Sequence, residues 1–407
     1  MLFPHVLAGL PLDARITKRE LEHRETMSRV VRASIVFGTR PEAIKMAPIV
    51  LAMRKDPRFE CSLCVTGQHR EMLDQVLEIF GIQADVDLRL MQPNQTLGGL
   101  TGRMIGSLDG YFASARPDLA LVQGDTSTVL CASLAAFYHH IPVGHVEAGL
   151  RTGNMQSPWP EEANRVLTTR LAALHFAPTT WCKNNLLAEG VAPQRIFVTG
   201  NTVIDALLLA RQKIRAGSLH INGLPGGNLD FLGQKRMILV TCHRRENFGA
   251  GFEKIFLAIR DLAERHPDIA FIHPMHLNPN VREPAQRILG GAGKKNVHLI
   301  EPVSYLPFVA MMERAHLILT DSGGIQEEAP SLGTPVLVMR DVTERPEGVQ
   351  AGTVRVIGSR REGIIEAVEK LLSSPEEYDA MTRAINPYGD GTATAKILDA
   401  CAAFPNT

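Results

Sequence analysis

The chain has 407 residues, and its 43 Lys and Arg balance 43 Asp and Glu, so the formal net charge is zero. A neutral chain has no bulk electrostatic affinity for nucleic acid or for an anionic membrane surface. Hydrophobic residues make up 45% of the chain, which excludes disorder for most of it. No apolar run approaches the roughly 20 residues that a helix needs to span a bilayer.

Residues 1–30 are predicted to be a poorly packed N-terminal extension. Pro4 and His5 break the short apolar stretch at its start, and no basic leader precedes that stretch, so we do not expect a signal peptide. Met27 lies a few residues before the first predicted strand and could be the natural start.

Short β-branched runs alternate with amphipathic stretches along the rest of the chain. The first six runs that predict strands are 32–39, 59–67, 119–126, 141–149, 174–179 and 195–200. The next six are 236–243, 268–276, 296–303, 316–324, 334–341 and 352–358. Helical spacing is clearest in 70–82, 252–266 and 306–315. Strands that alternate with helices form parallel sheets covered by helices on both faces.

Residues 217–235 are rich in Gly and Pro and lack periodicity, so they are the best candidate for a connection between domains. Six predicted strands lie on either side of this segment. We therefore expect an α/β fold of two doubly wound, Rossmann-like domains that face each other across a cleft. In such sheets ligands bind beyond the carboxyl ends of the strands.

The six cysteines favour a reducing compartment, since most lie in apolar runs that predict buried free thiols. Cys61 and Cys64 have redox or metal-site spacing. They fall within a predicted strand, however, and no second Cys or His pair accompanies them, so a structural role is favoured. We expect a cytoplasmic protein without a metal.

Basic residues follow the first predicted strand. Arg40 and Lys45 flank the start of a helix after Gly38, where helix amides favour an anion. The chain has neither a GxGxxG after a strand nor a GxxxxGK[ST] motif. A dinucleotide oxidoreductase and a P-loop nucleotidase therefore lose their main sequence support.

Three carboxylates are predicted at the rim of the first sheet. Asp125 and Glu147 each follow a strand, and Glu161 starts a helix after Pro160. Each one alone is more typical of a helix cap or a helix-start charge. Together they could divide general-acid and general-base roles.

The second half presents basic and glycine-rich strand ends. His243 follows one strand. His273 and His276 lie at the end of another, in a spacing that does not favour a shared metal. Ser322 and two glycines open a short helix that carries Glu328 one turn later. Small residues let backbone amides approach a diphosphate, and a carboxylate can accept bonds from ribose hydroxyls. This pattern is typical of a nucleotide-sugar site.

Together these segments resemble the non-hydrolysing UDP-N-acetylglucosamine 2-epimerases. The matching motifs run in order over more than nine-tenths of the chain: GTRPEAIKMAP, TGQHREML, QGDTST, VEAGLRTGNMQSPWPEEANR, TGNTVIDAL, HRRENFG, HLNPNVREP, TDSGGIQEEAPSLGTPVLVMRDVTERPE and NPYGDGTA. The resemblance implies a GT-B-like arrangement. Its expected parts are a catalytic domain at 31–205, a UDP-binding domain at 206–380 and a helix at 381–407 that returns to the first domain.

The resemblance also implies the reaction, a reversible epimerisation of UDP-GlcNAc to UDP-ManNAc without NAD or another cofactor. A base removes the proton from carbon 2 of the sugar while UDP leaves carbon 1, which gives 2-acetamidoglucal and UDP. The proton then returns to the other face and UDP adds again. A homodimer formed through the first domain and a supply of ManNAc units for envelope polysaccharide are implied as well.

Residue by residue, the resemblance assigns two sets of site positions. The catalytic set is Asp125, Glu147, Glu161 and His243. The UDP-binding set is Arg40, Lys45, Phe308, Ser322, Gly323, Gly324, Glu328 and Arg345, with Phe308 and Arg345 near the uridine.

Some relatives bind a second UDP-GlcNAc as an activator, and three residues fall in segments that resemble that site: Gln68, His69 and His276. Glu71 and Asn94 stand where regulated relatives use Gln and Arg, so strong allostery is not expected. Val303 stands where relatives often carry Gln.

Four other interpretations stay open at this point. A GT-B glycosyltransferase would share the nucleotide half but has no need for three rim carboxylates. A hydrolysing epimerase would release free ManNAc and UDP. A nucleotide-sugar sensor would not need the acidic and basic sets together. A UDP-diaminouronic acid epimerase would use the same frame on another sugar.

Overall fold

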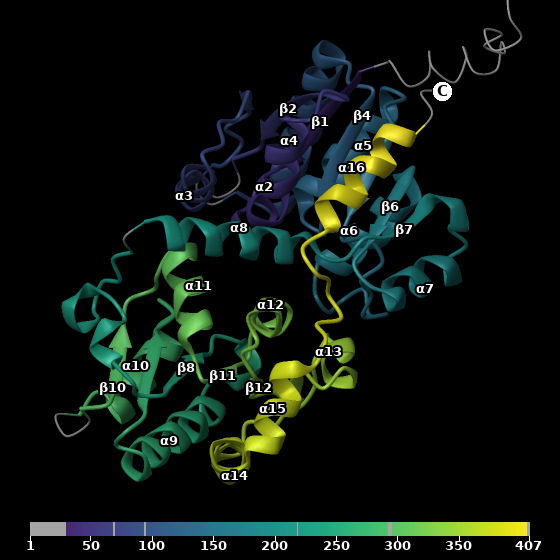
Figure 1. Ribbon diagram of the computed structural model, residues 1–407. Coiled ribbons are helices and arrows are strands. Elements are labelled where there is room, and N and C mark those ends of the chain that lie inside the picture. The colour runs from purple at the N-terminus through teal and green to yellow at the C-terminus, as the bar shows by residue number, and fades with distance from the viewer. Residues whose placement is uncertain (1–29, 68–69, 93–94, 218, 292–294, 405–407) are drawn as a thin grey trace, which may run out of the picture.

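The structure is a computed structural model that describes residues 30–67, 70–92, 95–217, 219–291 and 295–404 (Figure 1). The extension predicted at 1–30 therefore lies outside the described residues except for Val30. Two parallel α/β halves make up the described chain. No described helix is both long enough and apolar enough to cross a bilayer.

The first half is built on a seven-stranded parallel sheet in the order β3-β2-β1-β4-β5-β6-β7. Its strands are β1 Val31–Phe37, β2 Phe59–Val65, β3 Val86–Asp87, β4 Leu119–Gln123, β5 Val143–Val146, β6 Leu174–Ala177 and β7 Ile196–Val198. Its helices are α2 Arg40–Met53, α3 Arg70–Phe80, α4 Leu97–Ala115, α5 Ser127–Tyr138, α6 Glu161–Leu171, α7 Thr180–Ala188 and the short 3-10 helix η2 Pro193–Arg195. The central strands are buried along their length because helices cover both faces.

The second half is built on a six-stranded parallel sheet in the order β10-β9-β8-β11-β12-β13. Its strands are β8 Met237–Thr241, β9 Ala270–Pro274, β10 Val297–Ile300, β11 Leu317–Thr320, β12 Val336–Val338 and β13 Val354–Val356. Its helices are α9 Ala250–Arg265, α10 Pro279–Leu289, α11 Tyr305–Arg314, α12 Gly323–Glu328, α13 Pro346–Gln350, α14 Arg361–Ser373 and α15 Pro375–Arg383. The 3-10 turns of this part are η3 Pro225–Gly227, η4 Asp230–Leu232, η5 Arg245–Asn247 and η6 Ala329–Leu332.

The α/β fold of two parallel sheets agrees with the sequence analysis, and all twelve predicted strands are present. The thirteenth strand, β3, was not predicted, because its two residues are too few to show an alternating pattern. The six cysteines are free thiols, and five of them are buried. Cys61 and Cys64 both lie in β2, as the structural interpretation of their spacing requires.

The chain passes between the halves twice. Helix α8 (Thr202–Ala216) follows β7 and contacts α2 of the first half as well as α11 and α12 of the second, and Figure 1 shows it between them. The crossing therefore begins with a helix, before the 217–235 segment that was predicted to connect the domains. Helix α16 (Ala393–Ala403) lies against α2 and α8, so the chain end returns to the first half. Domain limits at 205 and 380 stay a prediction.

Candidate active site

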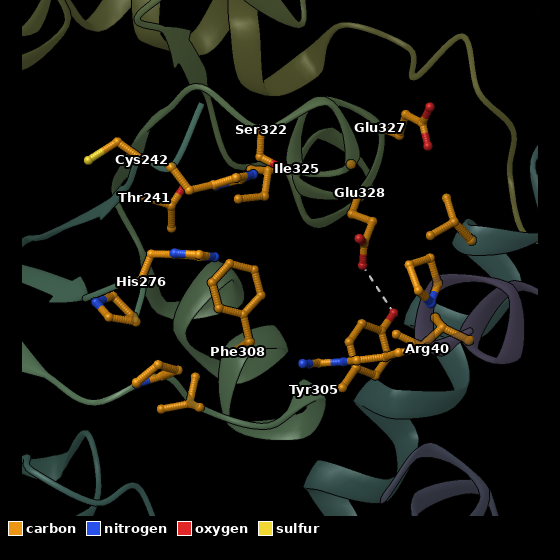
Figure 2. A pocket seen from close by; sticks show the side chains of 18 of the residues that line it. Arg40, Thr241, Cys242, His276, Tyr305, Phe308, Ser322, Ile325, Glu327 and Glu328 are labelled. Atoms are coloured by element: carbon orange, nitrogen blue, oxygen red, sulfur yellow. Dashed lines mark hydrogen bonds between the residues drawn. The ribbon is translucent and has the colours of Figure 1, made fainter. Parts of the chain in front are cut away.

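A cavity of about 590 Å³ lies between the two halves, at the carboxyl edges of both sheets. Its lining includes Arg40, Ile44 and Lys45 of α2. Facing them are residues of the second half that lie at strand ends and in the segments that follow: Thr241, His243, His276, Val303, Tyr305, Phe308, Ser322, Gly324, Glu327, Glu328 and Arg345. Figure 2 shows the Phe308 ring at the middle of this cavity.

The turn before α2 is held by Glu42, whose carboxylate is buried. It accepts hydrogen bonds from the amides of Thr39 (2.8 Å) and Gly38 (3.3 Å), which makes the capping box of α2. It also accepts a bond from the Thr126 hydroxyl at 2.8 Å, so it ties the turn after β1 to the turn after β4. Burial raises the pKa of Glu42 to about 7, although these bonds oppose the rise. Sequence reasoning missed this residue, but Thr followed three residues later by Glu is the signal that reveals it.

At one wall of the cavity, Glu328 points toward Tyr305, and Glu327 points to the other side of α12 (Figure 2). The Tyr305 hydroxyl donates to Glu328 at 3.0 Å. Burial raises the pKa of Glu328 to about 7. Burial also lowers the pKa of Arg40, whose guanidinium lies beside Tyr305 in the figure. A carboxylate and a cation therefore face the same space with little solvent around them.

Glu147 directly follows β5 in a left-handed conformation, with φ of 65°, which is uncommon for a residue other than glycine. Its side chain accepts a 2.5 Å bond from the Lys45 ammonium and a further bond from the Gln123 amide. Burial raises its pKa, and Lys45 partly offsets the rise. Strained backbone of this kind is concentrated at functional sites.

Gly149, two residues later, has no room for a side chain. Its φ is 91°, and a Cβ there would lie 2.3 Å from the Cys182 carbonyl oxygen. Glycine is therefore required for the chain to leave β5 in this direction.

Asp125 follows the neighbouring strand β4, and its carboxylate is paired with the Arg165 guanidinium of α6. Arg165 also contacts Glu162 at 3.1 Å, and the Asn164 amide donates to the Asp125 carbonyl at 2.9 Å. Glu161 is half-buried at the first residue of α6. Adjacent strands and the following helix thus bring these carboxylates to one edge of the sheet.

In the second half, the turn that carries His243 is organised by a buried carboxylate, Asp321. It accepts bonds from the amides of His243 at 3.0 Å and Arg244 at 2.9 Å, and from the Asn247 side chain at 3.2 Å. The His243 ring lies 3.5 Å from Asp321 and stacks on His276 with centroids 5.7 Å apart. Burial lowers the pKa of His243, which Asp321 only partly opposes. We therefore expect a neutral imidazole at pH 7, able to donate a hydrogen bond.

The amino end of α12 lies beside two guanidinium groups. A Cβ at Gly323 would lie 3.6 Å from the Arg244 guanidinium and 3.9 Å from that of Arg345. Gly324 and Ser322 line the cavity beside it. This combination of small residues and guanidinium groups suits a phosphate group.

Comparison with known proteins identifies the family and the fold to which this cavity belongs. Residues 51–402 match the family model of UDP-N-acetylglucosamine 2-epimerase. The chain belongs to this family.

Two solved structures and one curated relative show how far the similarity extends. The chain is 60% identical over 366 residues to the UDP-N-acetylglucosamine 2-epimerase of Escherichia coli K12, which covers 90% of this chain and 96% of the relative. The crystal structure of the Neisseria meningitidis enzyme bound to UDP-GlcNAc is 52% identical, with a TM-score of 0.80 over 90% of this chain and 98% of the other. A putative enzyme from Listeria monocytogenes is 48% identical, with a TM-score of 0.84 over 91% and 96%. These neighbours have the GT-B-like fold that was expected for this chain.

The structure brings most residues of the predicted catalytic and UDP-binding sets to one cavity. Eight predicted residues line the cavity: Arg40, Lys45, His243, Phe308, Ser322, Gly324, Glu328 and Arg345. Asp125, Glu147, Glu161 and Gly323 lie outside its lining, although Glu147 reaches it through Lys45.

Of the candidate allosteric residues, His276 lines the same cavity. Gln68 and His69 lie outside the described residues, as does Asn94. Val303, where relatives often have Gln, lines the cavity with an apolar side chain. An allosteric role for these residues stays a prediction.

Proposed function

We propose that this protein is a non-hydrolysing UDP-N-acetylglucosamine 2-epimerase that interconverts UDP-GlcNAc and UDP-ManNAc. The observation that carries the proposal is the position of Lys45. It lines a cavity suited to a nucleoside diphosphate, and its ammonium contacts the buried Glu147 carboxylate at 2.5 Å. A cation that stabilises the leaving diphosphate would thus lie next to a carboxylate that can exchange a proton.

In the proposed reaction the carbon 2–hydrogen bond and the carbon 1–oxygen bond of the sugar break, and a carbon 1–carbon 2 double bond forms. One of Asp125, Glu147 and Glu161 takes the proton, and UDP leaves with the electron pair of the carbon–oxygen bond. Return of a proton to the opposite face and addition of UDP complete the cycle. No outside oxidant or reductant is needed.

The second half supplies the stabilisation that this elimination requires. A hydrogen on carbon 2 is only weakly acidic, so the departing diphosphate must be strongly stabilised. Ser322, Gly323 and Gly324 would hold the diphosphate, together with Arg40 and Lys45. His243 would donate to it as a neutral imidazole, because burial lowers its pKa. Glu328 would accept bonds from the ribose, with Phe308 and Arg345 near the uridine.

Proton NMR of UDP-GlcNAc with the purified protein in heavy water, without added cofactor, tests the proposal. We expect UDP-ManNAc to accumulate to a fixed ratio with deuterium at carbon 2. Free ManNAc and UDP would instead support the hydrolysing epimerase. An unchanged spectrum would point to another UDP-sugar, such as a diaminouronic acid derivative, or to a glycosyltransferase that lacks its acceptor.

We further propose a cytoplasmic homodimer that supplies ManNAc units for envelope polysaccharide. Exposed apolar side chains on two neighbouring helices of the first half support a subunit interface there: Phe137 and Tyr138 on α5 and Leu167 on α6. Light scattering coupled to gel filtration checks the dimer, and a monomeric mass at micromolar concentration would contradict it.

A further inference from the structure

Four charged side chains between the two halves form an alternating row. Glu147 contacts Lys45 at 2.5 Å, Lys45 lies 3.9 Å from Glu327, and Glu327 pairs with Arg345. The side chains of Glu147 and Glu327 are 6% and 2% exposed. Two carboxylates thus share a single ammonium with little solvent between them.

Within this row, the contact between Lys45 and Glu327 is the one that joins the two halves. Lys45 belongs to α2, and Glu327 belongs to α12. Glu327 is also held where the chain crosses between the halves. Its carboxylate accepts a 3.2 Å bond from the Asn201 amide before α8, and its carbonyl accepts a 2.8 Å bond from Asn386 before α16. Its distance from Lys45 is therefore set by how the two halves sit together.

This arrangement affects Glu147 through Lys45. An opposite charge favours an ionised carboxylate, and a like charge nearby disfavours it. If the halves were apart, Lys45 would form an ion pair with Glu147 alone. When they meet, Glu327 brings a second negative charge to the same ammonium, in a dry environment where such interactions are strong.

We propose that Glu327 is a positioning residue that shares Lys45 with Glu147, and so couples the meeting of the two halves to the readiness of Glu147 to take up a proton. This inference rests on the proposed epimerase function. The proton would then be exchanged only where water is excluded and the diphosphate is bound. Glu327 was not among the site residues that the sequence predicted.

The charged and titratable groups around Glu147 agree with this role. Those that act on it or respond to it are Lys45 of α2, Glu327 of α12, Arg345 before α13 and Cys182 of α7. Burial raises the pKa of Glu147, Lys45 and Arg345 lower it, and Glu327 raises it further. Burial raises the pKa of Glu327 itself, but Arg345 and Lys45 outweigh burial and keep it ionised. Around Glu327 lie Arg345, Lys45, Glu328 and Tyr388.

The test is the pH dependence of turnover in E327Q, which removes one negative charge and keeps the side-chain shape. We expect the limb governed by Glu147 to move about one pH unit lower, because a like charge near Lys45 is lost. E327D, whose shorter side chain withdraws from Lys45, should move it part of the way in the same direction. E327D alone decides the question if E327Q does not fold.

Glu347→Gln is the matched control. Glu347 also bridges the halves, since it accepts a 2.8 Å bond from the Thr179 hydroxyl, but it does not contact Lys45. A merely structural role of Glu327 predicts that E327Q and E347Q lower the rate with the pH profile unmoved, and that result would overturn the inference. Deuterium incorporation at carbon 2 in the wild-type protein is measured in parallel. Its absence would refute the epimerase function itself and not the role of Glu327.

Discussion

The carboxyl edges of the two sheets face each other, but the carboxylates that follow their central strands are stabilised in different ways. At the first edge, Asp125 and Glu147 are paired with cationic side chains, Arg165 and Lys45. At the second edge, the fully buried Asp321 is held by two backbone amides and an asparagine. Side-chain cations can be drawn away by a ligand or a neighbouring charge, whereas backbone amides cannot.

This difference suggests that the two sheet edges have different roles in the reaction. The first edge suits groups whose protonation changes during a reaction cycle. The second edge suits a fixed template that binds a nucleotide in one geometry, because preorganised donors need not rearrange when charge develops. Four predictions test or sharpen this comparison.

The largest effect is expected from removing proton exchange at the first edge. D125N, E147Q and E161Q should each lower turnover by roughly 10²–10⁴-fold, the usual contribution of a positioned acid or base. UDP affinity should stay within about threefold of the wild type in calorimetry, since the second edge is intact. Glu189→Gln, at an ion pair with Arg151 in the same half, is the control. Wild-type turnover in all three variants would remove these carboxylates from the mechanism.

Behind both edges lies a buried histidine, so acid should weaken both halves alike. His145 donates to the Gly124 carbonyl at 2.7 Å and His273 to that of Val240 at 2.9 Å. Burial lowers the pKa of each to about 4. The unfolded chain therefore binds protons first, and stability that is complete above about pH 6.5 is lost as the pH falls toward 4.

Urea unfolding at pH 7 and pH 5 measures this loss. The unfolding free energy at pH 7 exceeds that at pH 5, and this difference should be about 2 kcal/mol smaller in H145Q or in H273N than in the wild type. Each new side chain keeps a hydrogen-bond donor but cannot be charged. His220→Gln, at an exposed site, should leave the difference unchanged. Equal pH dependence in the wild type and both variants would show that these rings are not the source.

At the second edge, Phe308→Ala should weaken UDP binding roughly 10–100-fold, the usual worth of an aromatic face for a base. Its ring projects into the cavity in Figure 2. Turnover at saturating substrate should change little, in contrast to the carboxylate variants. Calorimetry with UDP checks the affinity, with Ile385→Ala at an exposed site after α15 as the control. An unaltered affinity for UDP would show that the uracil ring does not contact Phe308.

The smallest effect concerns Glu328, a carboxylate of the second edge that lines the cavity. The pKa of Glu328 is raised by burial to about 7, so its charge is lost as the pH falls from 8 to 6. Ribose hydroxyls donate better to an ionised carboxylate, so UDP affinity should fall about threefold to tenfold over this range. E328Q should show a flatter pH dependence.

Tyr305→Phe provides a finer check of the same group. The Tyr305 hydroxyl donates to Glu328 and so lowers the pKa of that carboxyl, within a net rise that burial causes. Without the hydroxyl, the midpoint of the affinity change should move to higher pH. A midpoint at the wild-type pH would show that this hydrogen bond does not set the charge of Glu328.

Much of the architecture could be predicted because its signals are local. Runs such as 236–243 are apolar along their length, as buried parallel strands require, and turn residues mark their ends. The two-residue β3 carries no such signal and was missed. Carboxyl ends of parallel strands meet at one edge, so the sequence alone predicts that Asp125 and Glu147 emerge at the same edge.

The partners of the site residues could not be predicted in this way. Lys45 was expected to meet a diphosphate, and in the structure it lies between Glu147 and Glu327. Glu42 was not singled out from the sequence, and its bond to the Thr126 hydroxyl ties two turns together. These contacts join segments that are far apart in the chain, and nothing in the local pattern around either partner encodes them.

The sequence by itself determined the alternation of strands and helices, the sheet edge at which each polar residue emerges, and the motifs that reveal the epimerase family. Backbone sterics and hydrophobic periodicity act over a few residues, so they are legible in the chain. Only the tertiary structure decided which charged side chains pair with one another and how far water is excluded from around them. Coulomb and desolvation energies depend on distances across the whole fold, and those distances exist only once the two halves have packed together.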